Sequence, residues 1–207
     1  MTTAFQYIFD RAETLGINRR AVTAQTTARD GTTRAVSRGG QIWRFDVKLP
    51  DGIRWTELRP YIEGSDFADR YTVGTVALSN AGYTSWLNNY QGTANNITGF
   101  SASWTQGANS ITLTANPTNT GAYHFRAGDI IQLGTTGRVY SVRSDVATGA
   151  TTVNLNRPVI DASGSGSLRI AQNVTWQVIC TEMPTWNLFA RDQVAWSGSF
   201  VFYEYML

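Results

Sequence analysis

A strict two-residue alternation is the feature of the sequence that most constrains the fold. Residues 43–49 read Trp-Arg-Phe-Asp-Val-Lys-Leu, with an apolar side chain at every odd position and a charged one at every even position. Successive side chains of a strand point to opposite faces, so this segment predicts a half-buried β-strand. Residues 174–180 repeat the pattern. Residues 196–205 place large apolar side chains on both faces, which predicts one long strand covered on both sides.

Helical signals are few. Residues 56–70 are the best candidate, because Leu58 and Ile62 fall one turn apart. Pro60 is tolerated only in the first turn of such a helix, and Gly64 is expected to cut the helix short. Before this segment, Pro50-Asp51-Gly52 has the residue types of a turn that closes the first strand.

The middle of the chain has a different composition. Residues 92–107 and 161–167 are rich in small polar residues, and short β-rich runs lie between them at 110–114, 129–133, 139–142 and 151–155. Short strands separated by glycine-bearing turns predict a compact β-barrel or sandwich. We therefore expect a mainly β protein: a β-sandwich-like core domain from residues 1–99 and 173–207, an inserted small β-barrel-like domain at 100–172, and one or two short helices.

Charge and cysteine content exclude several classes of protein. The chain has 207 residues, with 17 basic and 15 acidic side chains, so its net charge of +2 is too small for an overall polyanion-binding surface. One cysteine permits neither an intramolecular disulfide nor a multi-cysteine zinc site, and fits a reducing compartment. No apolar run approaches the roughly 20 residues that span a bilayer, and the N-terminus lacks a secretory pattern. We expect a soluble protein made in the cytoplasm.

The arginines are unevenly distributed. Six of the sixteen lie between Arg19 and Arg44 and are accompanied by one acid, Asp30. Asp30-Gly31 is a hairpin-turn dipeptide, so residues 17–44 predict a polar, arginine-rich hairpin or arm. Such an arm can bind phosphates or dock on a neighbouring subunit; residues 17–40 contain no lysine and no aromatic residue, which favours docking. Candidate partner-binding residues are Arg19, Arg20, Arg29, Arg34 and Arg38, with Trp86 and Trp104 in glycine- and asparagine-rich surroundings.

Sequence motifs for catalysis are missing. His124 is the single histidine, and no cysteine or acid lies at metal-ligand spacing from it. Cys180 lies in an alternating strand, the setting of an inert buried thiol. Asp129 follows Gly128 at a strand entry, which is typical of turn chemistry. Two distant carboxylates could still form a glycosidase pair. We expect no enzyme activity, no catalytic metal and no cofactor.

Several stretches together resemble small tail and baseplate proteins of contractile-tailed bacteriophages. They are residues 38–47 (RGGQIWRFDV), the turn at 50–52, the helical segment 55–70 and residues 82–87 (GYTSWL). Residues 127–133 (AGDIIQL), 138–142 and 151–158 are similar to the inserted β module of tail-tip and distal-tail adaptors. The resemblance implies a viral structural protein of the virion, either ripcord-like or distal-tail-like. Such a subunit forms a homo-oligomeric ring that joins tail tube, central hub and surrounding baseplate. It implies no membrane partner and no nucleic-acid specificity.

Two other classes stay open at this stage. The first is a carbohydrate- or receptor-binding module of a tail fibre or adhesin, in which exposed Trp and Tyr side chains would stack on sugar. The second is a small hydrolase attached to the tail. Tube, sheath and hub genes beside the coding gene would favour the structural subunit, whereas a host-recognition locus would favour the binding module.

Overall fold

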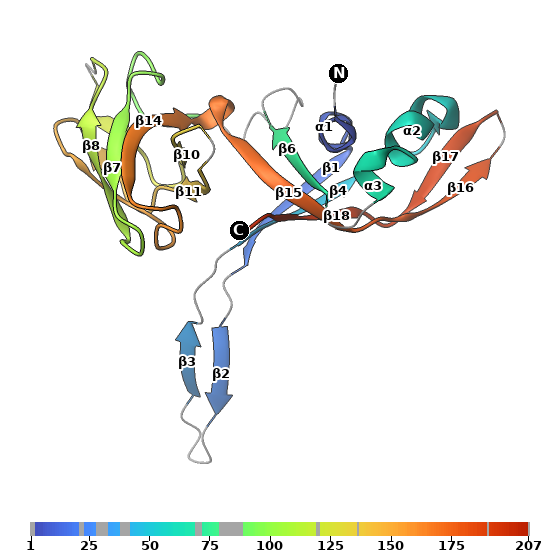
Figure 1. Ribbon diagram of the computed structural model, residues 1–207, viewed down its shortest axis with the longest axis horizontal. Helices are drawn as coiled ribbons and strands as arrows, with labels where there is room; N and C mark the ends of the chain where they lie inside the picture. Colours follow the sequence, from blue (N-terminus) through green and yellow to red (C-terminus); the bar gives the residue numbers. More distant parts are fainter. Residues whose placement is uncertain are drawn as a thin grey trace. The chain divides into compact units, whose positions relative to one another are not determined.

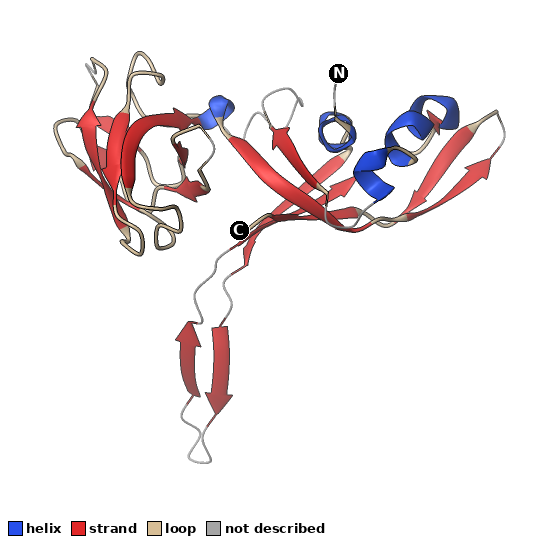
Figure 2. Cartoon of the chain, in the orientation of Figure 1, coloured by secondary structure: helices blue, strands red, loops and turns tan. Residues whose placement is uncertain are grey.

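The computed structural model describes residues 3–20, 23–27, 33–37, 42–68, 72–78, 89–118, 121–135, 137–189 and 191–206. The protein is mainly β, as predicted, and short helices accompany the strands (Figures 1 and 2). It divides into two compact units. Unit 1 combines Met1–Gly74 with Val178–Leu207, and unit 2 is Thr75–Gln177. Unit 1 thus combines residues from both ends of the chain, and unit 2 lies between them in the sequence.

A five-stranded antiparallel sheet forms the centre of unit 1 (Figure 1). Its strands, in spatial order, are β1 (Thr14–Arg20), β4 (Ile42–Lys48), β18 (Phe200–Glu204), β15 (Thr175–Glu182) and β6 (Val73–Ala77). The alternation in β4 is confirmed, because Trp43, Phe45 and Val47 are buried while the residues between them are partly exposed. Phe200, Val201 and Phe202 of β18 are all buried, so this strand is covered on both faces as predicted.

The N-terminal helix α1 (Ala4–Asp10) packs on this sheet. Thr3 caps it, because the Thr3 hydroxyl accepts a hydrogen bond from the Gln6 N–H. Phe5 and Phe9 are fully buried and make edge-on or tilted contacts with Phe202, with ring centroids 5.2 and 5.0 Å apart. These aromatic contacts hold the first turns of the chain on its last strand.

Two short helices occupy the segment predicted to be one helix. They are α2 (Trp55–Ile62) and α3 (Ser65–Ala68), and Gly64 lies between them, as expected of a helix terminator. The prediction for Pro60 was wrong, because Pro60 lies in the second turn of α2. A helix of eight residues tolerates this proline, since the missing N–H affects a single hydrogen bond close to the C-terminal end.

Unit 1 also contains a three-stranded ribbon, with spatial order β16 (Thr185–Phe189), β17 (Gln193–Ser197) and β5 (Ile53–Arg54) (Figure 1). The single strand predicted over 196–205 is therefore two strands, β17 and β18. They are separated at Gly198, whose φ of 106° is unfavourable for any residue with a side chain. Trp186 of β16 stacks on Trp55 of α2, with ring centroids 4.3 Å apart, so the helix and the ribbon pack together.

Unit 1 also contains a separate two-stranded ribbon, which we call the arm ribbon: β2 (Thr23–Thr27) and β3 (Thr33–Ser37). Its register pairs Thr27 with Thr33 and Thr23 with Ser37. In chain order the arm ribbon lies between β1 and β4, which are themselves paired from Thr14↔Lys48 to Arg20↔Ile42. The predicted hairpin is confirmed.

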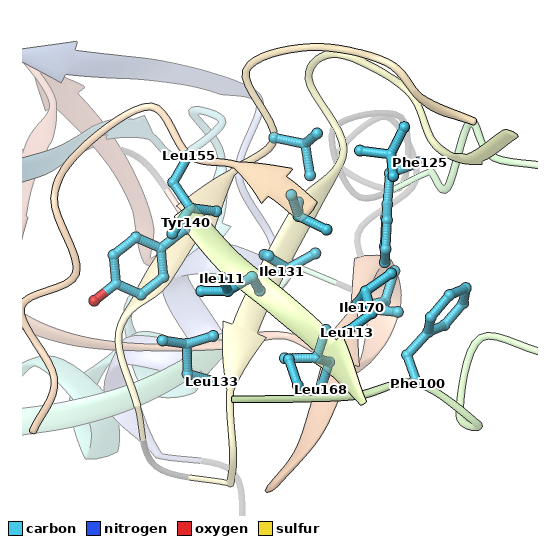
Figure 3. Close-up of a cluster of buried hydrophobic side chains, with 14 of the residues drawn as sticks. Phe100, Ile111, Leu113, Phe125, Ile131, Leu133, Tyr140, Leu155, Leu168 and Ile170 are labelled. Atoms are coloured by element: carbon cyan, nitrogen blue, oxygen red, sulfur yellow. The ribbon is translucent and has the colours of Figure 1, made fainter. Parts of the chain in front are cut away.

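Unit 2 is built from short strands around one apolar core. A six-stranded sheet has the order β11-β10-β14-β7-β8-β13, and a smaller sheet pairs β12 with β9. The strands are β7 (Ser101–Trp104), β8 (Ser110–Ala115), β9 (Tyr123–Phe125), β10 (Ile130–Leu133), β11 (Val139–Ser141), β12 (Val146–Ala147), β13 (Thr152–Asn154) and β14 (Gly164–Ile170), followed by the 3-10 helix η2 (Ala171–Asn173). Phe100, Phe125, Ile131, Tyr140 and Ile170 are fully buried between them (Figure 3).

The boundary of the insert lies earlier than the composition suggests. The sequence places it at residue 100, whereas unit 2 begins at Thr75. Tyr90, Ala94 and Ile97 pack against the core of unit 2, and the Gln91 N–H donates to the Asp129 carboxylate at 2.8 Å. The small polar residues after 92 therefore mark a segment that covers this core rather than a linker between domains.

Candidate interaction surfaces

The structure describes the backbone of three of the five predicted partner-binding arginines and the side chain of none of them. Arg19 and Arg20 lie in β1, opposite Trp43 and Ile42 of β4, and Arg34 lies in β3 opposite Thr26. Arg29, Arg38 and Trp86 lie outside the described residues, as do the side chains of Arg19, Arg20 and Arg34. Their assignment to partner binding remains a prediction.

The arm ribbon has little apolar content of its own. Val36 is the single large apolar residue in its two strands, and the other positions are Thr, Ser, Gln, Ala and Arg. The described residues show β2 and β3 pairing with each other and with no third strand. A two-stranded ribbon is marginally stable in water, and three strands or packing on another element are needed for independent stability. The arm ribbon therefore gains little stability from its own strand pairing.

Charge is divided unequally within unit 1. Residues 19–41 contain five arginines and one aspartate, whereas residues 3–18, 42–68, 72–74 and 178–206 contain six basic and ten acidic side chains. Three of those six basic groups already have acidic neighbours: Arg11 pairs with Glu57, Arg44 with Asp46 at 2.7 Å, and Lys48 with Glu13 at 3.5 Å. The positive arm and the negative remainder of the unit are complementary in charge.

Trp104 is described fully. It lies in β7, opposite Ile111 of β8 and Gly164 of β14. Its indole N–H donates to the Ala162 carbonyl at 2.8 Å, and its half-buried ring packs against the core of unit 2. The buried part of the Trp104 ring stabilises unit 2, so only the exposed part of the ring could contact a partner.

The outer strand of the three-stranded ribbon carries an apolar surface that the sequence reading missed. Leu188 and Phe189 of β16 are 52% and 46% exposed, and Met183 just before it is 40% exposed. On β17, Val194, the residue opposite Leu188, is fully buried. The apolar face of the three-stranded ribbon is therefore buried at Val194 and exposed to solvent at Leu188. The uncharged run Thr185–Phe189 was visible in the sequence, but its place at a sheet edge was not.

The candidate nucleophiles and bases serve structural purposes. His124 is buried, and its Nε2 accepts a hydrogen bond from the Gly149 N–H at 3.3 Å, which requires the neutral imidazole. Burial lowers the pKa of His124 below 6.5. The Cys180 side chain is only partly buried, and desolvation raises the pKa of its thiol to about 12, which keeps it protonated at neutral pH.

Asp129 confirms the turn interpretation. Its carboxylate accepts hydrogen bonds from the N–H groups of Gln91 and Arg126, both at 2.8 Å. Burial is the main influence on its pKa, which is raised, and the backbone hydrogen bonds oppose that rise. Gly128 beside it has a φ of 101°, a conformation that glycine adopts without strain. The Asp129 carboxylate therefore joins two loops of unit 2, and backbone N–H groups of the protein itself use its acceptor oxygens.

Within the described ranges, no three His, Cys, Asp or Glu side chains lie close enough together to hold a metal ion. The described helices are also all too short or too polar to cross a membrane.

Two open hollows lie on unit 2. One, of about 340 Å³, is lined by Asn109, Arg143, Ser144 and Asn154. The other, of about 440 Å³, is lined by Thr98, Ser167, Leu168, Arg169 and Asn173. The described residues lining them include no Trp or Tyr, the side chains on which sugar rings stack.

Comparisons with known proteins gave no match: no protein-family model matches the chain, and no curated protein is significantly similar to it.

Proposed function

We propose that this chain is a structural subunit of a contractile bacteriophage tail, a ring-forming adaptor that links tail tube, central hub and surrounding baseplate. The resemblance of residues 38–47 and 127–133 to tail and baseplate proteins is the first support. In this role the protein is made in the host cytoplasm and resides in the virion tail. It works without a cofactor, without a membrane and without sequence-specific contacts to nucleic acid.

The arm ribbon is the observation that carries the proposal. Its ten residues in β2 and β3 form strands although they contain one large apolar side chain. Since a two-stranded ribbon without an apolar face gains little from its own packing, a neighbouring molecule is the natural source of the missing contacts. A subunit whose fold is completed by its neighbours suits a component of a ring.

The choice of arginine fits protein docking. Five arginines with one acid in residues 19–41 repel one another unless a partner supplies carboxylates. The guanidinium fork binds a carboxylate through two parallel hydrogen bonds and is weakly hydrated, which suits an interface that excludes water. A lysine-free arm thus favours defined subunit contacts over loose attraction to a polyanion.

A non-catalytic role agrees with how the chemically active side chains are used. His124 and Asp129 bind backbone N–H groups of unit 2 through their acceptor atoms, and the high pKa of Cys180 keeps its thiol protonated. His124 and Asp129 thus stabilise the loops that they join. The proposal therefore assigns the protein a mechanical function: to hold other subunits in position.

The test changes Arg19, Arg20 and Arg29 together to Ala. The variant should fold as the unaltered protein does, by circular dichroism and thermal unfolding, but fail to enter tail particles assembled with it. The matched variant with Lys at the same three positions should restore incorporation only in part, because a point charge does not supply the bidentate fork.

Two results would count against the proposal. If the alanine variant enters particles normally while losing a salt-sensitive affinity for duplex DNA, the arm is a phosphate-binding element. If the unaltered protein binds a surface polysaccharide and is absent from the tail ring, it is a receptor-binding module.

A further inference from the structure

The β16 edge, meaning residues 183–189 along the outer side of β16, is an unfinished sheet edge. In the three-stranded ribbon, β16 is terminal, and among the described strands only β17 pairs with it (Figure 1). The outward N–H and C=O groups of such a strand are a template for one more strand. Exposed Met183, Leu188 and Phe189 lie along the same edge.

Proteins usually protect an exposed edge strand with charges, a proline or a bulge within it. The run Thr185–Phe189 contains no charged residue and no proline, and it pairs with β17 in continuous register from Thr185↔Ser197 to Phe189↔Gln193. Pro184 directly precedes β16, but β16 itself is regular, uncharged and without a bulge. An unprotected edge of this kind is retained where a specific strand covers it in the assembled state.

We propose that the β16 edge receives the arm ribbon of a second copy of this chain, which adds strands to the three-stranded ribbon. The inference rests on the proposed function, because it takes the arm ribbon to be a docking element. What it adds is the acceptor site and the identity of the partner.

The arm ribbon and the β16 edge match in strand length, and each has features that the other could complement. β2, β3 and β16 have five residues each, so either arm strand can pair along the whole of β16. The arm ribbon lacks a third strand and an apolar surface, whereas the β16 edge has apolar side chains without a cover. Pairing them supplies backbone hydrogen bonds to both and reduces the exposure of Leu188 and Phe189, which lie on opposite faces of β16.

Charge favours the same pairing. Residues 51–63 and 182–197, which form α2 and the three-stranded ribbon with its flanks, contain three basic and five acidic side chains. Among these acids, Glu182 lies beside Met183 at the start of the β16 edge, and Asp51 accepts a hydrogen bond from the Trp196 N–H. The five arginines and one aspartate of residues 19–41 are the complementary set.

Each copy has one arm ribbon and one β16 edge, and these are different parts of unit 1. The contact is therefore donor to acceptor, and it can repeat from copy to copy, as a ring of identical subunits requires.

The experiment measures molar mass by analytical ultracentrifugation for three full-length variants. Leu188→Lys blocks the edge with a charge that repels the arm, and position 188 is exposed enough to accept it. Val73→Lys is the control, because Val73 is 39% exposed and lies on β6, at the end of the five-stranded sheet. The third variant is the Arg19, Arg20 and Arg29 to Ala change in the arm. Circular dichroism and thermal unfolding verify that all three fold.

We expect the unaltered protein and V73K to self-associate at tens of micromolar, and L188K and the arm variant to be monomers when measured alone. Mixing L188K with the arm variant should give a 1:1 heterodimer and nothing larger, because one intact arm meets one intact edge.

A mixture that stays monomeric, or an unaltered protein that stays monomeric, overturns the inference. Normal self-association of L188K overturns it too. If L188K also enters tail particles while the arm variant does not, the proposed function stands and the arm docks elsewhere.

Discussion

Unit 2 and the arm ribbon are both made of short antiparallel strands, yet they differ in what stabilises them. The strands of unit 2 surround a continuous apolar core that includes Phe100, Phe125 and Tyr140, all fully buried. The arm ribbon has two strands and Val36 as its one large apolar side chain. Strand pairing alone contributes little to the free energy of folding when neither face of the ribbon is buried. Unit 2 is therefore stabilised by its own core, whereas the arm ribbon has little apolar surface of its own to bury and is suited to contact with another molecule.

The largest expected effect tests the self-supporting region. Phe125→Ala should lower the free energy of unfolding by about 3–5 kcal/mol, because it leaves a cavity beside Phe100, whose ring centroid lies 4.8 Å away. Phe189→Ala is the matched control: Phe189 is 46% exposed, so its removal should cost less than about 1 kcal/mol. Urea unfolding of both variants measures the difference, and equal losses would contradict the assignment of the core.

The buried carboxylate of unit 2 gives the next effect. Asp129→Ala should cost about 2–3 kcal/mol, since it leaves the N–H groups of Gln91 and Arg126 without their acceptor. The control is Glu13→Ala, at a 50% exposed side chain whose ion pair with Lys48 contributes little. If both variants lose the same stability in thermal unfolding, Asp129 does not join the loops as described.

Cysteine reactivity tests burial in the central sheet of unit 1. With a pKa of about 12, the Cys180 thiol is almost wholly protonated at pH 8, so alkylation by iodoacetamide should be at least about a hundredfold slower in the native protein than in urea. Mass spectrometry of the alkylated peptide over time gives both rates. Similar rates in the two states would show that Cys180 is accessible and reactive.

A smaller effect depends on pH. Burial lowers the pKa of His124 in the folded state below its value of 6.5 in the unfolded chain, so the unfolded state binds the proton more readily. The stability due to neutral His124 is complete above pH 6.5 and is lost as the pH falls below it. His124→Gln removes the titration, so its loss of Tm between pH 7.5 and 5.5 should be smaller than that of the unaltered protein. An identical pH profile would contradict the prediction.

The smallest change in stability is expected in the arm. Replacement of Arg19, Arg20 and Arg29 by Ala should shift the free energy of unfolding of the monomer by less than about 0.5 kcal/mol, because the proposed contacts of the arm are intermolecular. The three lysine replacements serve as the control for net charge. A loss above about 2 kcal/mol in the alanine variant alone would place these side chains in the fold of the monomer and break the comparison.

Periodicity predicted the strands well. The odd positions of 43–49 become the buried face of β4, and the short runs of unit 2 appear as β8, β10, β11 and β13. A local pattern is sufficient there because each strand has one buried and one exposed face, or is buried throughout. The arm hairpin was also predictable, from Asp30-Gly31 between two polar runs.

Features that depend on tertiary contacts were not predictable. The break between β17 and β18 is an exception, because Ser197-Gly198-Ser199 has turn-type residues that the alternating pattern on either side outweighed. The segment before residue 100 belongs to unit 2, because Tyr90 and its neighbours pack on a core that lies later in the chain. The β16 edge was missed because sequence alone does not show which strand is last in a sheet.

Hydrogen exchange of the arm ribbon tests the central claim most directly. The backbone amides of β2 (Thr23–Thr27) and β3 (Thr33–Ser37) should exchange within seconds in the dilute monomer, while those of β10 (Ile130–Leu133) stay protected for hours. At concentrations where the protein self-associates, the arm amides should become at least about a hundredfold slower, with β10 unchanged. Slow exchange of the arm amides in the dilute monomer would contradict the account, because the arm ribbon would then be stable without a partner.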